Sequence, residues 1–453
     1  MFRKILIANR GEIAVRIIRA CREMGIETVA VYSEVDESSL HVQLADEAVC
    51  IGPAPARDSY LNIVNILSAT VLTNAEAIHP GYGLLSENTK FARMCEQCNI
   101  KFIGPTSDAM LAMGDKLNAR LTMIAADVPV IPGSRRAVNT VAEALEDAEI
   151  GGYPVLVKAA SGGGGKGIRR VNEPGEMAAA LDAAKAEAAA AFGDDVVYIE
   201  KLLGAAHHIE FQIISDSQGN AVHLFERDCS MQMGRQKLVE ESPSCLLTPE
   251  LRERMGEDAI RAASAVGYTG VGTIEYLLDD EGNYYFIEMN TRVQVEHPVT
   301  EMVTGVDIVR EQISIAAGEP LSFGQSDVAL NGYALECRIN ACNPSRSFMP
   351  SCGTVELVHL PGGLGVRVDS LLYNGAEVLP YYDSMIGKII VHAANREEGI
   401  IRMKRALSEI ALRGVDTNVD FQYALIDSPS FSSGKFATDS VDQMLLSGEI
   451  ILE

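Results

Sequence analysis

Polar and apolar residues alternate in one short segment, and this pattern constrains the fold more than any other feature of the chain. The polar members are Glu288, Asn290, Arg292, Gln294 and Glu296, and the apolar residues beside them are Ile287, Met289, Val293 and Val295. In an extended chain, such alternation places all the polar groups on one face. A straight strand would separate Glu288 from Glu296 by roughly 26 Å at ~3.3 Å per residue, too far for one small-molecule site.

We therefore expect a strand that ends at about Met289, followed by a loop that wraps around a substrate. A solvent-facing edge strand would show the same alternation, because polar residues commonly occupy the exposed face of a sheet. Such a strand has little need for two carboxylates, an amide and a guanidinium in one row. We interpret the segment as the centre of a functional site.

The first part of the chain alternates strand and helix signals. Lys4–Ala8 and Glu27–Tyr32 are expected to be buried strands, and the residues between them a helix. Shorter strand signals follow at Ala77–Ile78 and Phe102–Ile103. This order predicts a parallel sheet with ligand-binding loops at the carboxyl ends of its strands. Because 453 residues are too many for one ordinary core, further domains are expected downstream.

A glycine-rich loop, Ser161–Gly167, follows a predicted strand that ends at Lys158. Adjacent glycines suit a loop whose amides approach an anion closely or a lid that moves. The spacing is not that of a Walker-type phosphate loop, and a flexible connector is the alternative. Lys158, together with Lys116, supplies the compact positive charges that hold phosphate oxygens.

A second group of residues offers oxygen ligands for a metal ion. Glu275, Glu288 and Asn290 are expected on two neighbouring strands. Carboxylates that face each other across strands repel, and a cation between them removes the conflict. Magnesium is commonly held by one or two carboxylates together with substrate phosphates. These residues therefore predict a magnesium site.

Composition excludes several classes of function. A net charge of −24 argues against non-specific nucleic-acid binding. No apolar run approaches the ~20 residues of a membrane span, and charge interrupts the N-terminus too early for a signal peptide. Nine scattered cysteines indicate free thiols in a reducing cytoplasm. Cys95 and Cys98 have helical spacing, which favours packing over a zinc site.

A series of motifs, in order along nearly the whole chain, resembles the biotin carboxylase family of ATP-grasp enzymes. These motifs are Ile7–Ala14, His79–Gly83, Met113–Lys116, Ser161–Gly167, Glu226–Ser230, Glu288–Pro298, Glu336–Asn340 and Tyr381–Met385. The resemblance implies a mixed α/β and α+β fold in three domains. They are a Rossmann-like N-terminal domain at 1–114, an ATP-grasp domain at 115–330 with a glycine-loop lid at about 131–203, and a β-rich C-terminal domain at 331–453.

The resemblance also implies the substrates and the residues that bind them. ATP would contact Lys116, Lys158, Gly163, Gly164, Gly165, Glu200, Lys201, Leu203, His208, Gln232 and Arg235. Two magnesium ions, or manganese in their place, would be held by Glu275, Glu288 and Asn290. Bicarbonate would be held by Lys237, Arg292, Gln294, Val295 and Glu296. Biotin would contact Tyr82, Gly83 and Arg338.

The implied catalytic residues are Glu296, Arg338, Arg292 and Lys237. Glu296 would deprotonate bicarbonate, which attacks ATP to give carboxyphosphate. Arg338 would stabilise the enolate-like biotin anion. Structural alternatives remain: Arg338 could be a buried ion-pair partner of Glu296, Tyr82 could simply pack, and His208 could be an ordinary histidine.

The chain departs from the family pattern at a few positions. Arg235 stands where a histidine is usual near the phosphates, and arginine keeps its charge at all working pH values. His207 replaces a usual arginine, Ala341–Pro344 lacks a usual acidic residue, and Leu364 replaces an aromatic residue. None of these changes removes a group that the reaction itself requires.

The partners also follow from the resemblance. The only Met-Lys pair, Met403-Lys404, lacks the signature of a biotin-carrying domain, and no carboxyltransferase-sized segment is present. We expect a free-standing subunit, such as that of acetyl-CoA carboxylase, acting on biotin held by a carrier protein, with a separate carboxyltransferase. A homodimer is expected through Arg19, Glu23, Leu364 and Arg367. The alternatives are another ATP-grasp ligase, of the carbamoyl-phosphate or purine-pathway type, or a silent nucleotide-binding subunit.

Overall fold

The computed structural model describes residues 1–161 and 167–451. Its N-terminal part is a five-stranded parallel sheet in the order β3-β2-β1-β4-β5. The strands are β1 (Lys4–Ile7), β2 (Glu27–Tyr32), β3 (Glu47–Cys50), β4 (Ala77–His79) and β5 (Lys101–Phe102). The helices are α1 (Gly11–Glu23), α2 (Leu40–Leu44), α3 (Ile63–Leu72), α4 (Thr89–Gln97) and α5 (Ser107–Gly114). These parallel pairings confirm the expected sheet. The apolar strand β1 is buried between its neighbours, as is usual in parallel sheets.

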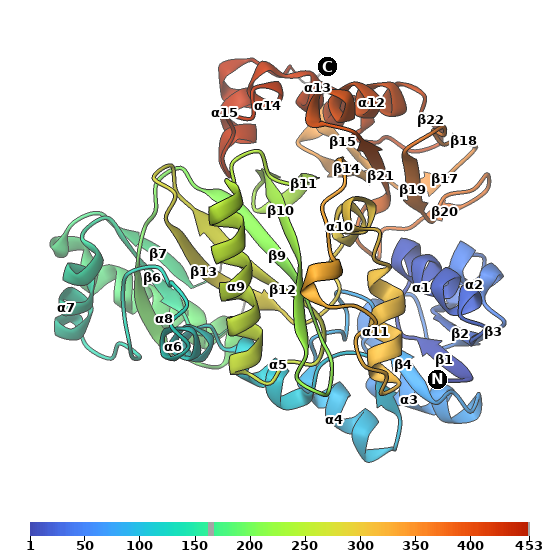
Figure 1. The fold of residues 1–453 in the computed structure, drawn as a ribbon, viewed down its shortest axis with the longest axis horizontal. Coiled ribbons are helices and arrows are strands. Elements are labelled where there is room, and N and C mark those ends of the chain that lie inside the picture. Colours follow the sequence, from blue (N-terminus) through green and yellow to red (C-terminus); the bar gives the residue numbers. More distant parts are fainter. Residues whose placement is uncertain (162–166, 452–453) are drawn as a thin grey trace.

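A small antiparallel sheet projects to one side of the molecule (Figure 1). It contains β7 (Ile168–Val171), β6 (Val155–Ala159) and β8 (Val197–Lys201), packed against α7 (Val141–Gly151) and α8 (Met177–Phe192). Helix α6 (Lys116–Ala125) leads into this module, and the Asp115 side chain caps its first turn. Gly163, Gly164 and Gly165, expected to bind ATP, lie outside the described residues.

The centre of the molecule is an eight-stranded antiparallel sheet in the order β13-β12-β9-β10-β11-β14-β21-β19. Its strands are β9 (His207–Ser215), β10 (Ala221–Met233), β11 (Gln236–Ser242), β12 (Gly270–Leu278), β13 (Tyr284–Asn290), β14 (Tyr333–Asn340), β19 (Val366–Ser370) and β21 (Met385–Ala393). The helices beside it are α9 (Pro249–Ala265), α10 (His297–Thr304) and α11 (Ile308–Ala316). Helix α9 lies along the strands at the middle of the molecule (Figure 1).

The C-terminal part completes the sheet and adds short strands and helices. The remaining strands are β15 (Cys342–Asn343), β16 (Met349–Pro350), β17 (Gly353–Thr354), β18 (Leu357–His359), β20 (Glu377–Val378) and β22 (Ala411–Arg413). The helices are α12 (Arg396–Ser408), α13 (Val419–Asp427), α14 (Pro429–Ser432) and α15 (Ser440–Ser447). Helix α12 ends at Ser408, and Ala411–Arg413 then pairs with β18.

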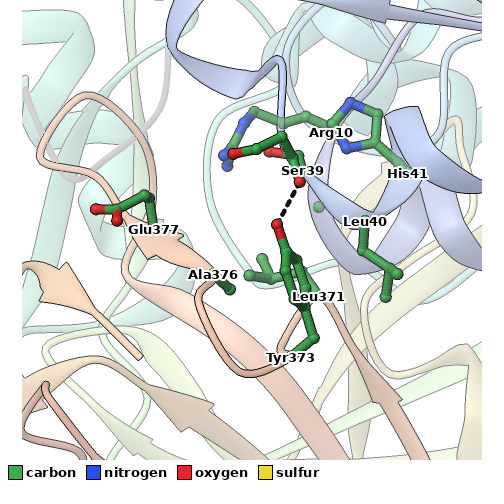
Figure 2. A pocket seen from close by; sticks show the side chains of 10 residues that line it. Arg10, Ser39, Leu40, His41, Leu371, Tyr373, Ala376 and Glu377 are labelled. Carbon is green, nitrogen blue, oxygen red and sulfur yellow. Dashed lines mark hydrogen bonds between the residues drawn. The ribbon is translucent and has the colours of Figure 1, made fainter. Parts of the chain in front are cut away.

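The N-terminal and C-terminal parts meet through polar contacts. The Arg10 guanidinium lies 3.8 Å from the centre of the Tyr382 ring, and it also pairs with Asp36 at 2.7 Å. The Tyr373 hydroxyl donates to the Ser38 carbonyl beside a pocket of about 10 Å³ (Figure 2). That volume is close to the minimum for one water molecule. Among the described residues, no helix combines the length and apolar character needed to span a membrane.

Candidate active site

The expected site residues gather around a large cavity of about 920 Å³. It lies against strands of the central sheet, the lid strands β6 and β7 and the loop before β21. The expected residues that line it are Lys116, Lys158, His208, Gln232, Arg235, Lys237, Glu275, Glu288, Asn290, Arg292, Gln294, Val295, Glu296 and Arg338. The volume falls within the usual range for small-molecule sites.

The alternating segment changes conformation close to the expected point. Strand β13 ends at Asn290, and a loop carries residues 291–296 to the start of α10. The predicted separation of polar and apolar faces was wrong at Ile287, which lines the cavity together with the polar residues; Val295, which the resemblance placed at the bicarbonate site, lines it too. The β12–β13 register shifts between Glu275 and Tyr276, which leaves Ile287 as an extra residue. A bulge of this kind turns a side chain to the opposite face of the strand.

Two carboxylates face each other across β12 and β13. Glu275 pairs directly with Glu288 in the register, and the Asn290 amide donates to Glu275 Oε1 at 2.8 Å. Burial, and then the charge of Glu275, raise the pKa of the Glu288 carboxyl. The Glu275 pKa is well below its usual range, because Lys237 and His208 outweigh the effect of burial. This crowded set of hard oxygen donors fits a magnesium ion.

Positive groups lie at the lid side of the cavity. Lys158 Nζ donates to Glu200 Oε2 at 2.7 Å, and His208 Nε2 lies 3.0 Å from Glu275 Oε2. Burial lowers the pKa of Lys116, although Glu288 opposes that effect. Within residues 1–161 and 167–451, Lys116 forms no ion pair. Its ammonium is therefore available to a phosphate.

Lys237 and Arg338 flank the carboxylate of Glu296. Lys237 Nζ lies 2.7 Å from Glu296 Oε1, and Arg338 Nη2 lies 3.0 Å from Glu296 Oε2. Burial alone would raise the pKa of Glu296, but Lys237 and Arg338 hold it below the usual range. Arg338 also donates to Glu240 Oε1 at 2.6 Å. The alternative of an Arg338 ion pair with Glu296 is therefore observed, and it occurs within the cavity itself.

Arg227 organises this region from beneath the cavity floor, a role that sequence reasoning missed. Its side chain is fully buried and donates to Gln294 Oε1 at 2.7 Å and to Glu210 Oε1 at 2.5 Å. Glu210 in turn accepts from Lys237 Nζ at 2.6 Å. A buried arginine surrounded by acceptors fixes side-chain orientation. The Glu226–Ser230 motif was the only signal that could have pointed to it.

Arg292 is held from the N-terminal part of the chain. Its Nε donates to Glu87 Oε2 at 2.9 Å, and its Nη2 donates to Asn290 Oδ1 at 2.9 Å. Glu87 also accepts from the Thr291 amide at 3.0 Å. The loop that follows β4 therefore sets the position of the guanidinium.

Some expected residues lie outside the cavity lining. These are Glu200, Lys201, Leu203, Tyr82 and Gly83. Lys201 Nζ donates to the Gly151 carbonyl at 2.6 Å, and the Tyr82 hydroxyl donates to Glu12 while its ring packs on the N-terminal core. Polar cavity residues that sequence reasoning did not assign include Asp383, Ser384, Thr438, Asp439 and Asp442. Of these five, Asp383 and Ser384 belonged to a recognisable motif.

Arg235 occupies the tip of the β10–β11 hairpin. Met233 pairs with Gln236 across the turn, so Gly234 and Arg235 are its two central residues. Both have positive φ, +56° and +69°, as in the two-residue turns that match strand twist. Arg235 is exposed at the cavity mouth, where its charge contributes to lowering the pKa of Lys116.

Comparisons with known proteins agree with this geometry. Three family models match in order: the biotin carboxylase N-terminal domain over 1–110, the ATP-binding domain of the carbamoyl-phosphate synthase L chain over 115–323, and the biotin carboxylase C-terminal domain over 336–443. Biotin carboxylase 1 of Bacillus subtilis is 56% identical, covering 97% of this chain and 98% of the relative. The biotin carboxylase of Nostoc sp. is 55% identical, covering 98% and 99%.

Solved structures are similar over the whole chain. A biotin carboxylase from Campylobacter jejuni, in complex with an ATP-type ligand, superposes with a TM-score of 0.94 at 47% identity, covering 98% of this chain and 99% of that one. The biotin carboxylase domain dimer of Hydrogenobacter thermophilus 2-oxoglutarate carboxylase, with MgADP, ADP and bicarbonate, has a TM-score of 0.94 at 48% identity, covering 100% of both chains.

The lid module, the central sheet and the paired carboxylates define an ATP-grasp enzyme. The close relatives share more than the nucleotide-binding part, because they match this chain from its N-terminal sheet to its last helices. The chain belongs to the biotin carboxylase family.

Proposed function

We propose that this chain uses ATP and bicarbonate to carboxylate biotin that is attached to a biotin carboxyl carrier protein. The observation that carries this proposal is the position of Glu296 between Lys237 and Arg338. A carboxylate in this position can accept the bicarbonate proton while two cations stabilise the anions on either side of it. A general ATP-grasp ligase needs the phosphate and metal groups but not this arrangement.

Different groups of cavity residues bind the nucleotide, the metal, bicarbonate and biotin. Lys116, Lys158 and His208, with Gln232 and Arg235 at the mouth, bind the nucleotide. Glu275, Glu288 and Asn290 would hold magnesium, which would supply positive charge to neutralise the phosphates. Lys237, Arg292 and Gln294, with the Val295 backbone, hold bicarbonate. Arg338 faces the biotin ureido group, and Tyr82 and Gly83 support that end of the site.

The chemistry proceeds in three balanced steps. Glu296 takes the bicarbonate proton, and a carbonate oxygen attacks the γ-phosphorus, forming carboxyphosphate and releasing ADP. Carboxyphosphate breaks its C–O bond to give CO2 and phosphate. The phosphate then removes the N1′ proton of biotin, Arg338 stabilises the resulting anion, and N1′ attacks CO2. Exclusion of water protects carboxyphosphate from hydrolysis.

Electrostatics explain why Lys237 is shared between several carboxylates. With Lys237 close to it, Glu296 is ionised but weakly basic, because its pKa is depressed. Lys237 also contacts Glu210 and Glu275 at 2.6 and 3.0 Å. An incoming anion competes for the same ammonium. Binding of bicarbonate beside ATP therefore weakens the hold of Lys237 on Glu296 and makes Glu296 a stronger base.

We assign the partners by the same reasoning. A separate carboxyltransferase passes the carboxyl group to its final acceptor, and relatives differ in this respect, since one is named as part of a pyruvate carboxylase. The chain forms a homodimer near Arg19, Glu23, Leu364 and Arg367, and Leu364 is 92% exposed. All nine cysteines are free, which supports a reducing compartment such as the cytoplasm. The domain limits of 1–114, 115–330 and 331–453 remain part of this proposal.

The test is bicarbonate-dependent cleavage of ATP by the purified chain with Mg²⁺, with and without free biotin. Biotin should stimulate ADP release, and Glu296→Ala should abolish that stimulation. ATP cleavage that ignores both bicarbonate and biotin would contradict the proposal and favour a different ATP-grasp ligase. A chain that binds ATP and never cleaves it would indicate a silent nucleotide-binding protein.

A further inference from the structure

Lys388 is a fully buried lysine. It lies behind the loop of residues 291–296, and the three proposed chemical steps do not use it. It lies on β21, directly opposite Arg338 on β14 and Asp369 on β19. Directly opposed residues point to the same face of a sheet. Arg338 and Lys388 are therefore adjacent cations that reach toward the same loop from neighbouring strands.

The two cations hold different parts of that loop. Arg338 contacts the side chain of Glu296 at 3.0 Å. Lys388 Nζ donates to the backbone carbonyl of Val295 at 2.5 Å. Like charges directly opposite each other destabilise a sheet, but each cation has its own carboxylate. Arg338 pairs with Glu240 at 2.6 Å, and Lys388 with Glu12 at 3.3 Å.

The direction of the Val295 carbonyl fixes the direction of the next amide. In a planar trans peptide, the C=O and N–H point in opposite directions. Because the carbonyl faces buried Lys388, the Glu296 N–H faces away from it. The Gln294 carbonyl is similarly held by the ring of buried His297, at 2.7 Å from Nδ1, so the Val295 N–H also points away from the buried side.

These two amide groups are free to bind an anion. Val295 and Glu296 line the cavity, whereas Lys388 and His297 do not. In the part of the chain that the structure describes, neither the Val295 N–H nor the Glu296 N–H donates a hydrogen bond to the protein. Successive amides that converge in this way form a concave anion-binding feature. Its orientation depends on the carbonyls behind it.

We propose that Lys388 is a positioning residue that orients the Val295–Glu296 peptide so that its N–H faces bicarbonate. The inference rests on the proposed function, since it assigns bicarbonate to this end of the cavity. Lys388 never touches the substrate. Its contribution is to bicarbonate affinity, and it is separate from the ATP site around Lys116 and Lys158.

The test compares Lys388→Met, Glu12→Gln and the double variant by steady-state kinetics and thermal denaturation. Lys388→Met removes the bond to the carbonyl and leaves Glu12 unpaired. We expect it to raise the KM for bicarbonate by about tenfold or more, the size of a lost bond to a charged group, with little change in the KM for ATP. The double variant removes both charges, so it should recover Tm while the KM for bicarbonate stays high.

Glu12→Gln alone is the matched control, because it keeps the Lys388 bond to Val295. Its KM for bicarbonate should stay within about twofold of the unaltered chain. The proposal is overturned if the double variant regains the original KM for bicarbonate, or if the KM values for bicarbonate and ATP rise together. If Lys388→Met fails to fold, the double variant decides the question. Failure of the proposed function can be told apart from failure of this inference, because ATP cleavage by the unaltered chain would then not depend on bicarbonate.

Discussion

The ammonium of Lys237 and the carboxylate of Glu296 lie 2.7 Å apart at the centre of the cavity. Both side chains are largely buried, with exposed fractions of 13% and 3%. Charge pairs in such surroundings interact more strongly than pairs in water. This contact therefore controls the basicity of Glu296, the residue that we propose accepts the bicarbonate proton, and removing the cation tests that control.

Lys237→Met should raise the pKa of Glu296, because Lys237 is the strongest charge that lowers it. In the proposed mechanism activity requires ionised Glu296, so activity is present above that pKa and is lost as pH falls through it. The acid limb of the pH–rate profile should therefore move toward neutral pH, alongside a loss of rate of about 100-fold. Arg235→Met is the control, because it removes a cavity cation that does not touch Glu296. An unmoved acid limb in Lys237→Met would contradict this account.

Glu288→Gln should weaken metal binding while leaving the fold intact. The variant removes one of the facing carboxylates on β12 and β13, and with it a hard ligand for magnesium. The Mg²⁺ concentration for half-maximal ATP cleavage should rise by about tenfold or more. Direct titration with Mn²⁺ gives a second measurement that does not depend on turnover. Glu281→Gln changes an exposed carboxylate at the tip of the same hairpin, and an equal effect there would argue against a specific site.

Two substitutions in the β10–β11 turn should change the free energy of unfolding in opposite directions. Gly234 has φ +56°, so Gly234→Ala should lower the free energy of unfolding by about 1 kcal/mol. Arg235 has φ +69°, which glycine adopts without strain, so Arg235→Gly should raise the free energy of unfolding. It should also raise the KM for ATP, since a charge at the cavity mouth is lost. Urea denaturation and ATP kinetics measure the two effects, and a stabilising Gly234→Ala would refute the turn assignment.

Glu241 should make the protein less stable as pH rises. Burial raises the pKa of this carboxyl to about 7, although Arg396 opposes the change. Between about 4.5 and 7 the folded state therefore binds more protons than the unfolded state, so stability falls through that window. A shift of this size corresponds to about 3 kcal/mol.

Glu241→Gln should remove the share of that dependence that comes from Glu241, while buried Glu240, whose pKa is also raised to about 7, keeps its own share. Urea midpoints of the two proteins at pH 5.5 and pH 8 measure the difference. Glu257→Gln, which changes an exposed carboxylate on α9, is the control and should keep the original slope. A parallel pH dependence in Glu241→Gln and the unaltered chain would exclude Glu241 as its source.

The end of β13 and the facing carboxylates were predictable because local patterns encode them, whereas Lys237, His208 and Arg338 were expected only from the family resemblance. Alternation and the flanking polar groups located the end of β13 to within one residue. The bulge at Ile287 was not predictable, because it depends on the register with β12. Glu210, Arg227 and Lys388 looked like ordinary strand residues. Their roles arise only when strands distant in sequence become neighbours, which periodicity along one strand does not report.

The domain boundary expected at 330/331 also misses a pairing between strands that are distant in sequence. Strand β11 and strand β14 lie on opposite sides of the expected boundary at 330/331, yet they pair over residues 239–242 and 334–337. The chain between them contains α9, β12, β13, α10 and α11, so the two strands are far apart in the sequence and their pairing is not evident from it. The backbone hydrogen bonds show that the central sheet runs across the expected boundary.

This continuous sheet has a consequence for how the molecule unfolds. A chain cut near residue 330 would lose Arg338 and Lys388 and would leave β11 with an unpaired edge, which is prone to aggregate. Amides of β11 and β14 should therefore exchange with solvent in one cooperative opening, with no folded intermediate that has lost only the C-terminal part. The parts of the chain on either side of residue 330 would then unfold, and be degraded, as one unit.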